Sequence, residues 1–354
     1  MNNVAPSDQP PRGSRAMRSR ATSILGALLA FALASLVLAC AVGSISVPLA
    51  ELPAALAEIL QGRVASMNAT LLELRLGRAC SGFATGAALA LAGVMMQALV
   101  RNPLADPYVL GISSGAAVGA LAALLAGAAL WVVDLGALAG ALGISFLLYL
   151  LARRDLGGNA RGDAGGDTGT LLLTGVILAS ACMALVTLML SIAPDSRLRG
   201  MVFWMIGDLS GTQWRLLPWL VLAGVLPFAL LRARALNVMA LHADAASTLG
   251  VATGGLRRSL FVCSGLLTAS AVSTAGSIGF VGLIVPHACR YAFGPDHRVL
   301  LPAAALAGGA FLMLADTLAR TVLAPQQLPV GVLTSLIGVP VFLVQLHQLR
   351  VRRP

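Results

Sequence analysis

The stretch GFATGAALALAGVMMQ, residues 82–97, carries no charged side chain and consists largely of glycine and alanine. A helix needs about 20 mostly apolar residues to cross the hydrocarbon core of a bilayer, and the apolar run around this stretch extends from 79 to 99. Small residues let helix backbones approach closely where lipid supplies no hydrophobic drive between helices. We therefore interpret the stretch as a tightly packed transmembrane helix and not as a phosphate-binding loop.

The rest of the chain has the composition of a polytopic membrane protein. Of its 354 residues, 58% are hydrophobic and 11% are charged, whereas a soluble domain usually carries about 25% charged residues. The candidate spans are 22–43, 79–99, 108–130, 132–152, 170–192, 214–233, 259–276, 278–294, 299–320 and 330–349. We expect an all-α polytopic membrane protein with about ten transmembrane helices.

Arginine placement predicts the orientation. All 24 basic residues are arginines, and cytoplasmic loops of membrane proteins are enriched in basic residues. A cytoplasmic N-terminus places most arginines on the cytoplasmic side, together with the C-terminus and the segment 234–258. This distribution explains the net charge of +10 better than nucleic-acid binding does.

Composition also divides the chain. We expect a disordered cytoplasmic N-terminus at 1–21, a single transmembrane domain at 22–349 and a basic cytoplasmic tail at 350–354. The glycine- and aspartate-rich segment 153–169 is expected to be disordered as well. The five cysteines form no C-x-x-C pair and are interpreted as small buried hydrophobes, with no metal site and no cofactor.

The segment RNPLADP, residues 101–107, predicts a tight turn between two spans. Pro103 and Pro107 end one helix and begin the next. Asn102 and Asp106 can accept hydrogen bonds from the backbone donors that the turn frees.

Two further polar positions lie in predicted spans. His287 follows Pro286 without a carboxylate in the same span, so a structural hydrogen bond is favoured over a ligand or a proton relay. Asp316 and Arg320 are four residues apart on one helix face, and their pair is open to a functional or a structural interpretation. The chain lacks a catalytic constellation and a lysine, so we expect neither an enzyme nor a P-loop ATPase.

Several motifs, in one order, resemble the FecCD family, the permease subunits of ATP-binding-cassette importers for iron-siderophores, haem and cobalamin. They are RLGR (75–78), QALVRNPLADP (97–107), LGISSGA (110–116), GSIGFVGLIVPHACR (276–290), DHRVLLP (296–302), ADTLAR (315–320) and LPVGVLTSLIGVPVF (328–342). Gly77 departs from the family pattern, which usually has proline there. The resemblance implies a type II importer permease fold in the inner membrane. It also implies, as expected partners, two ATPase subunits, a periplasmic binding protein and a second permease copy.

The resemblance also implies roles for single residues. Arg75, Arg78 and Arg320 would dock the binding protein, with interfacial snorkelling as the alternative. The loop 234–258 would couple to the ATPase through Leu241, His242, Asp244, Ala245, Leu249 and Gly250. Thr168 and Gly169 would narrow the cytoplasmic end of the pathway.

We therefore expect a permease that imports an iron chelate (siderophore or haem) or cobalamin by alternating access. A proton- or ion-coupled secondary transporter is the alternative, and it would need buried carboxylates or histidines in a relay. A membrane-embedded enzyme is a third hypothesis, which the absence of catalytic sets disfavours. The motifs do not distinguish among the cargoes.

Overall fold

A computed structural model describes residues 12–351 except 44, 46, 154–155, 157–165, 211–214 and 242–252. This part of the chain forms α-helices and two short 3-10 helices and contains no β-strand, which confirms the all-α prediction. The α-helices are α1 (Arg12–Ala41), α2 (Leu52–Leu60), α3 (Met67–Val100), α4 (Ile112–Leu125), α5 (Leu130–Ala152), α6 (Gly166–Ile192), α7 (Asp195–Ile206), α8 (Leu217–Leu241), α10 (Thr253–Ala275), α11 (Val281–Phe293), α12 (His297–Ala319) and α13 (Val330–Val351). The 3-10 helices are η1 (Leu49–Glu51) and η2 (Pro107–Leu110).

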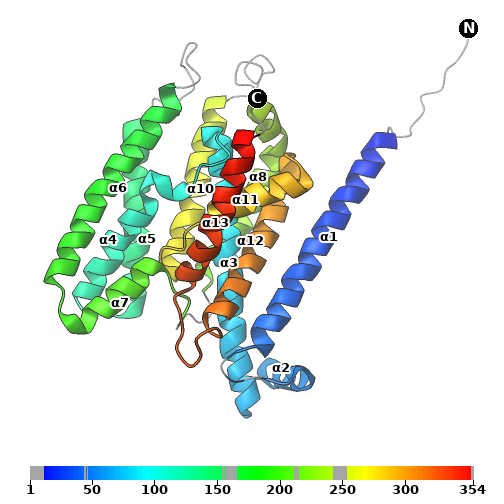
Figure 1. Cartoon of the computed structure of the whole chain (residues 1–354), viewed down its shortest axis with the longest axis vertical. Helices are drawn as coiled ribbons and strands as arrows, with labels where there is room; N and C mark the ends of the chain where they lie inside the picture. Colours follow the sequence, from blue (N-terminus) through cyan, green and yellow to red (C-terminus); the bar gives the residue numbers. More distant parts are fainter. Residues whose placement is uncertain are drawn as a thin grey trace, which may run out of the picture.

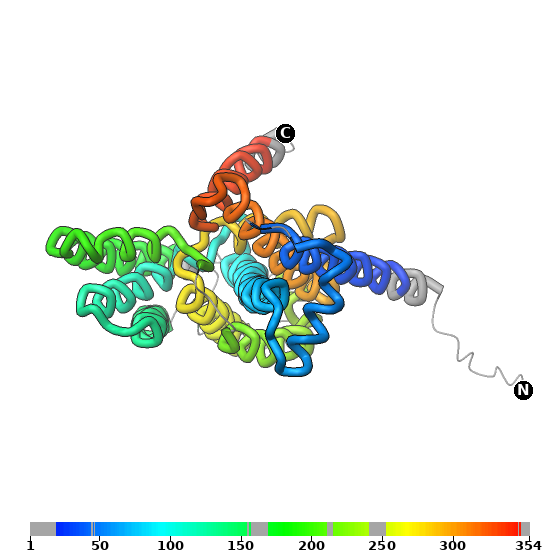
Figure 2. Tube along the Cα trace, turned by 90° about the horizontal axis from the view of Figure 1, so that it is seen from below, coloured from blue at the N-terminus to red at the C-terminus, as the bar shows by residue number. Residues whose placement is uncertain are grey.

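Helix α3, which contains the opening stretch, is the centre of the bundle. Seen along its axis, it is surrounded by α8, α10, α11 and α12 (Figure 2). A Cβ atom at Gly93 would overlap the backbone carbonyl of Gly282 in α11, and one at Gly86 would overlap that of Gly308 in α12. The glycines therefore set the close approach of these backbones.

A second small-residue interface joins α4 to α5. A Cβ atom at Gly119 would overlap the carbonyl of Gly136, and one at Gly140 would overlap the carbonyl of Gly115. Helix α6 packs outside this pair, while α1 leans on the opposite side of the bundle and contacts α12 and α3 (Figure 1).

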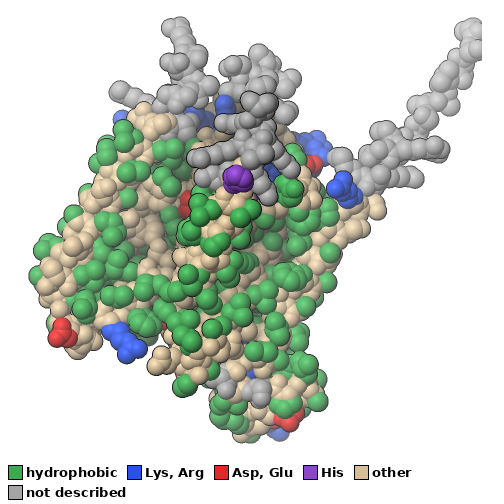
Figure 3. Space-filling view, in the orientation of Figure 1, with side chains coloured by type: hydrophobic (Ala, Val, Ile, Leu, Met, Phe, Trp, Pro, Cys, Tyr) green, Lys and Arg blue, Asp and Glu red, His purple; other side chains and the backbone are tan. Residues whose placement is uncertain are grey.

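The bundle has two distinct ends. The end of α5, the start of α6, the end of α8 and the start of α10 lie at one end, together with the start of α1 and the end of α13 (Figure 1). We call this the inner end, after the orientation that the arginines predict, and the end that carries α2 the outer end. Charged side chains gather toward the two ends of the visible face, with an apolar and uncharged belt between them (Figure 3).

The expected count of about ten spans is not confirmed. Within the described residues, six helices are long and apolar enough to cross a membrane by length and composition: α1, α3, α5, α6, α8 and α12. Helix α11 has 13 residues, which gives about 20 Å of rise against a hydrocarbon core of about 30 Å. The predicted span 108–130 is divided into η2, the 14-residue α4 and a turn before α5.

Two helices begin inside segments that were expected to be disordered. Helix α1 begins at Arg12, so residues 12–21 are helical, and α6 begins at Gly166, so residues 166–169 are helical. The physical reason is that extending a formed helix is far easier than nucleating one, and alanine, arginine and methionine are good helix formers. Helices α2 and α7 lie in segments where no helix was predicted.

Candidate functional site

A buried ion pair joins α3 to α12 near the outer end. Arg78 Nε donates to Asp316 Oδ2 at 2.8 Å, and Arg78 Nη2 donates to Asp316 Oδ1 at 2.7 Å. Arg320 Nε lies 4.0 Å from Asp316 Oδ2, so Arg78 and not Arg320 is the principal partner of this carboxylate. The third nitrogen of Arg78, Nη1, donates to Gln327 Oε1 at 3.0 Å.

Arg75 and Arg320 hold the end of α1. Their residues are 7% and 8% exposed, and their guanidinium groups donate to backbone carbonyls at the C-terminal end of α1 and just beyond it. The acceptors of Arg75 are Cys40, Ala41 and Ile45, and the acceptor of Arg320 is Ala39. The last carbonyls of a helix have no partner within the helix, so both arginines cap α1. Because Arg320 is buried against α1, the structural interpretation of the Asp316–Arg320 pair is favoured. The docking role expected for Arg75, Arg78 and Arg320 is not tested by these contacts.

The RNPLADP turn is built by its own side chains. Asn102 Oδ1 accepts from the backbone N–H of Leu104 at 2.9 Å, and Asp106 Oδ1 accepts from that of Tyr108 at 2.7 Å. Helix η2 then begins at Pro107. Desolvation raises the pKa of Asp106 to about 6, against the lowering effect of the Tyr108 hydrogen bond.

Sequence reasoning missed two polar contacts at the inner end. Gln97 of α3 accepts a hydrogen bond from Arg290 Nη1 at 2.9 Å, and its own Nε2 donates to the carbonyl of Leu283 at 3.3 Å. These contacts tie α3 to α11. The signal was the presence of a glutamine and an arginine near the C-terminal ends of α3 and α11, after mostly apolar turns.

The second missed contact lies beside the predicted coupling loop. Asn237 Nδ2 of α8 donates to Asp296 Oδ1 at 2.7 Å, and Asn237 Oδ1 lies 2.7 Å from His297 Nδ1 and accepts from the backbone N–H of His297 at 2.9 Å. Asp296 is the N-cap of α12. Partial burial raises its pKa, but the Arg298 N–H and the Asn237 amide outweigh this effect, so the net pKa is lowered. The contact fixes the end of α8 to the start of α12.

Of the predicted coupling residues, only Leu241, the last residue of α8, is described. His242, Asp244, Ala245, Leu249 and Gly250 lie outside the described residues. The predicted gate residues Thr168 and Gly169 fall in the first turn of α6, at the inner end.

His287 lies in α11 directly after Pro286. Its Nδ1 atom is buried and has no hydrogen-bond partner, so the expected structural hydrogen bond at this atom is not present. In the described part of the chain, no three His, Cys, Asp or Glu side chains gather in a group that could hold a metal ion.

Comparison with known proteins assigns the family. The model of the FecCD transport family matches residues 28–348. The vitamin B12 import system permease proteins BtuC of Escherichia coli O127:H6 and of Salmonella paratyphi A are each 42% identical to the chain over 276 residues, which covers 77% of this chain and 81% of theirs.

Solved structures agree on the fold. An inward-facing conformation of a metal-chelate type ABC transporter matches with a TM-score of 0.77 and 30% identity, covering 92% of this chain and 99% of the other. PsaBC from Streptococcus pneumoniae, in complex with Fab, matches with a TM-score of 0.53 at 17% identity, which bears on the fold alone. The family match spans nearly the whole helical bundle, and the chain belongs to the FecCD transport family.

Proposed function

We propose that the chain is the permease subunit of an ATP-driven importer that carries vitamin B12 or an iron chelate, such as a siderophore complex or haem, into the cytoplasm across the inner membrane. The observation that carries this proposal is the 42% identity to vitamin B12 permeases over 77% of the chain. The match to a metal-chelate type transporter over 99% of that chain adds support. Vitamin B12 is the first cargo to test, since the curated relatives carry that name.

The proposed assembly contains two copies of this chain, two ATPase subunits and an external binding protein. The segment 234–258 would contact the ATPase, because it contains the end of α8 at Leu241 and the start of α10 at Thr253, and both lie at the inner end. The Asn237 contact with α12 would pass a movement of that segment into the bundle. Thr168 and Gly169 would narrow the pathway at the same end.

The binding protein would dock at the outer end. Arg75 and Arg320, which are buried, would act there by fixing the position of α1. Arg78 is only partly buried, with a side chain that is 12% exposed. About ten membrane-spanning segments, with both termini cytoplasmic, complete the proposal.

The alternative, a proton- or ion-coupled secondary transporter, needs buried carboxylates or histidines in a relay. Asp316 is disfavoured for that role because Arg78 binds both of its carboxylate oxygens. This observation supports the importer over the relay mechanism.

The test is reconstitution in liposomes with the ATPase and the binding protein. Labelled vitamin B12, a ferric siderophore and haem are offered separately, with ATP, without ATP, and with a proton gradient alone. We expect uptake that requires ATP and the binding protein. Uptake that follows the proton gradient without ATP would refute the importer assignment, and the cargo accepted would fix the substrate.

A further inference from the structure

Helix α2 presents an exposed apolar side at the outer end. Pro53, Leu56 and Leu60 are spaced three and four residues apart, so they lie on one side of the helix. Leu49, in η1, extends the same row by one turn. All four residues are exposed in the described part of the chain, and Leu60 is 80% exposed. We call these four residues the apolar row.

The opposite side of α2 is polar. Glu51, Glu58 and Gln61 are spaced seven and three residues apart, so they share a side of the helix that points away from the apolar row. Acidic and basic side chains are visible at the outer extremity of this end of the molecule (Figure 3). A short helix with one apolar and one polar side is typical of helices that lie in the plane of a membrane surface.

The third side of α2 fixes its depth. Ala55 is buried in one apolar cluster with Cys40 of α1 and with Ala69 and Leu72 of α3. The apolar span of α1 ends at Ala41, so α2 packs where α1 reaches the end of its span. Helix α2 lies crosswise to α1 there, at the edge of the bundle and away from α6 and α13 (Figures 1 and 2). This position is that of a helix at the boundary between lipid and water.

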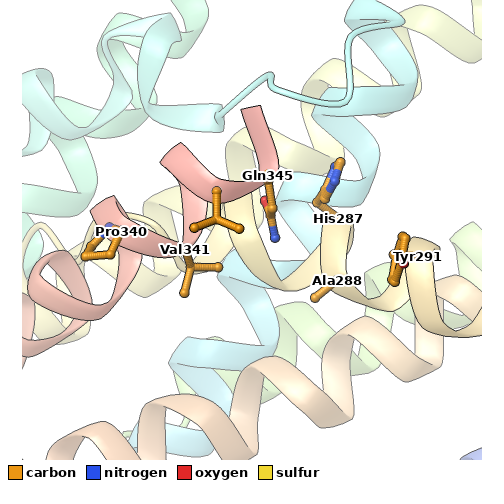
Figure 4. Close-up of a pocket in the computed structure, with 7 residues that line it drawn as sticks. His287, Ala288, Tyr291, Pro340, Val341 and Gln345 are labelled. Carbon is orange, nitrogen blue, oxygen red and sulfur yellow. The ribbon is translucent and has the colours of Figure 1, made fainter. Parts of the chain in front are cut away.

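An apolar crevice connects the flank of α1 to the apolar row. It has a volume of about 420 Å³, and Val37 and Leu38 of α1 line it together with Leu49 of the row. Every described side chain in its lining is apolar. The crevice between α11 and α13 differs, because His287 and Gln345 contribute polar groups to it (Figure 4). A crevice without a hydrogen-bonding side chain is suited to a hydrocarbon chain.

From this geometry we propose that α2 is an interfacial helix that binds the outer surface of the lipid bilayer. The apolar row inserts among the acyl chains of the outer leaflet, one acyl chain occupies the crevice beside Leu49, and the polar side of α2 stays in water. The charged residues of this helix and its N-cap, Glu58 and Glu51, are acidic, so insertion depends on apolar contact and not on attraction to anionic lipids. The inference needs only a membrane location and holds whichever cargo the protein carries.

Fluorescence quenching by spin-labelled lipids tests the proposal on the full-length protein in nanodiscs. Leu56→Cys and Leu60→Cys carry an environment-sensitive fluorophore, in a background whose five native cysteines are replaced by alanine. Ala54→Cys is the matched control, because Ala54 is exposed and lies about 160° around the helix from Leu56.

Interfacial helices bury their apolar side about 5–10 Å deep. A nitroxide near the start of the acyl chain should therefore quench the labels at positions 56 and 60, and a nitroxide at the end of the chain should quench them less. The label at position 54 should lose little fluorescence with either lipid. Equal quenching at the three positions, or no quenching at positions 56 and 60, would overturn the proposal.

A substitution and two additions separate lipid from the binding protein as the occupant. Leu60→Asp should reduce the quenching of the label at Leu56→Cys, whereas Gln61→Asp, on the polar side, should leave it unchanged. Raising the content of anionic lipid, or adding the binding protein, should not change the quenching at position 60. Loss of that quenching when the binding protein is added would assign the apolar row to protein docking and reject the lipid contact.

Discussion

Arg78 and Asp316 are 238 residues apart in sequence, and two hydrogen bonds of 2.8 and 2.7 Å join their side chains. Their side chains are 12% and 5% exposed. Removing one partner of a buried ion pair leaves an uncompensated charge and costs about 3–5 kcal/mol.

We therefore expect Asp316→Leu to lower stability by about that amount. Arg78→Met combined with Asp316→Leu should cost clearly less than the sum of the two single variants, because neither charge is then left alone. The stability of each variant is measured as the fraction of protein that stays monodisperse after heating in detergent. Additive effects of the two substitutions would show that the pair is not the stabilising contact.

The arginines at the end of α1 give a second prediction. Arg75→Ala should release α1 from the bundle, because Arg75 donates to carbonyls at Cys40, Ala41 and Ile45. We expect faster protease cleavage between α1 and α2. Arg63→Ala, an exposed arginine near the same end, is the control and should cleave like the parent protein. A variant that keeps normal cleavage but loses affinity for the binding protein would instead favour direct docking by Arg75.

The glycine contacts predict a strong position dependence. Gly93→Ala forces a Cβ atom into the carbonyl of Gly282, and overpacking of this kind costs about 1–3 kcal/mol. Gly224→Ala in α8 meets no atom within 4 Å and should be neutral or stabilising by up to about 1 kcal/mol, since alanine favours helix. Thermal aggregation of the two variants compares them, and similar losses would contradict the packing argument.

Asp296 predicts a pH dependence at the inner end. Its pKa is lowered in the folded protein, so its contribution is fully present above the ordinary aspartate pKa of about 3.9 and is lost as pH falls through the lower folded-state value. Asp296→Asn retains an oxygen acceptor without the charge. We expect the parent protein to lose more thermal stability than the variant between pH 6 and pH 3. Identical pH profiles would count against this role of the carboxylate.

The coupling segment supplies a prediction from sequence. Ala245→Glu should block ATPase assembly or separate ATP hydrolysis from uptake while the membrane domain stays folded. ATPase co-purification and vesicle uptake are the measurements, with Ala245→Ser as the control. Normal ATPase assembly and uptake by the Ala245→Glu variant would show that the coupling site lies elsewhere.

The sequence predicted the helical class well because apolar composition is a local property. The preference of about 20 apolar residues for lipid can be read without knowing which helices pack beside them. In the same way, the glycines of α3 indicated close packing before their partners were known. The division of the predicted span 108–130 into η2, α4 and a turn was not predictable in this way. Apolar content alone does not reveal that Pro107 starts a short turn of helix that is buried against the bundle.

The partners of the charged residues were the least predictable part. From sequence, Arg320 was the natural partner of Asp316, because residues four apart share a helix face. The structure instead brings Arg78 from α3 to that carboxylate and turns Arg320 toward the end of α1. The sequence by itself determined the membrane class, the small-residue interfaces and the family motifs, all of which depend on nearby residues. Only the tertiary structure decided which buried polar groups meet. A charged side chain that is removed from water needs a polar partner, and that partner comes from whichever helix the packing places beside it.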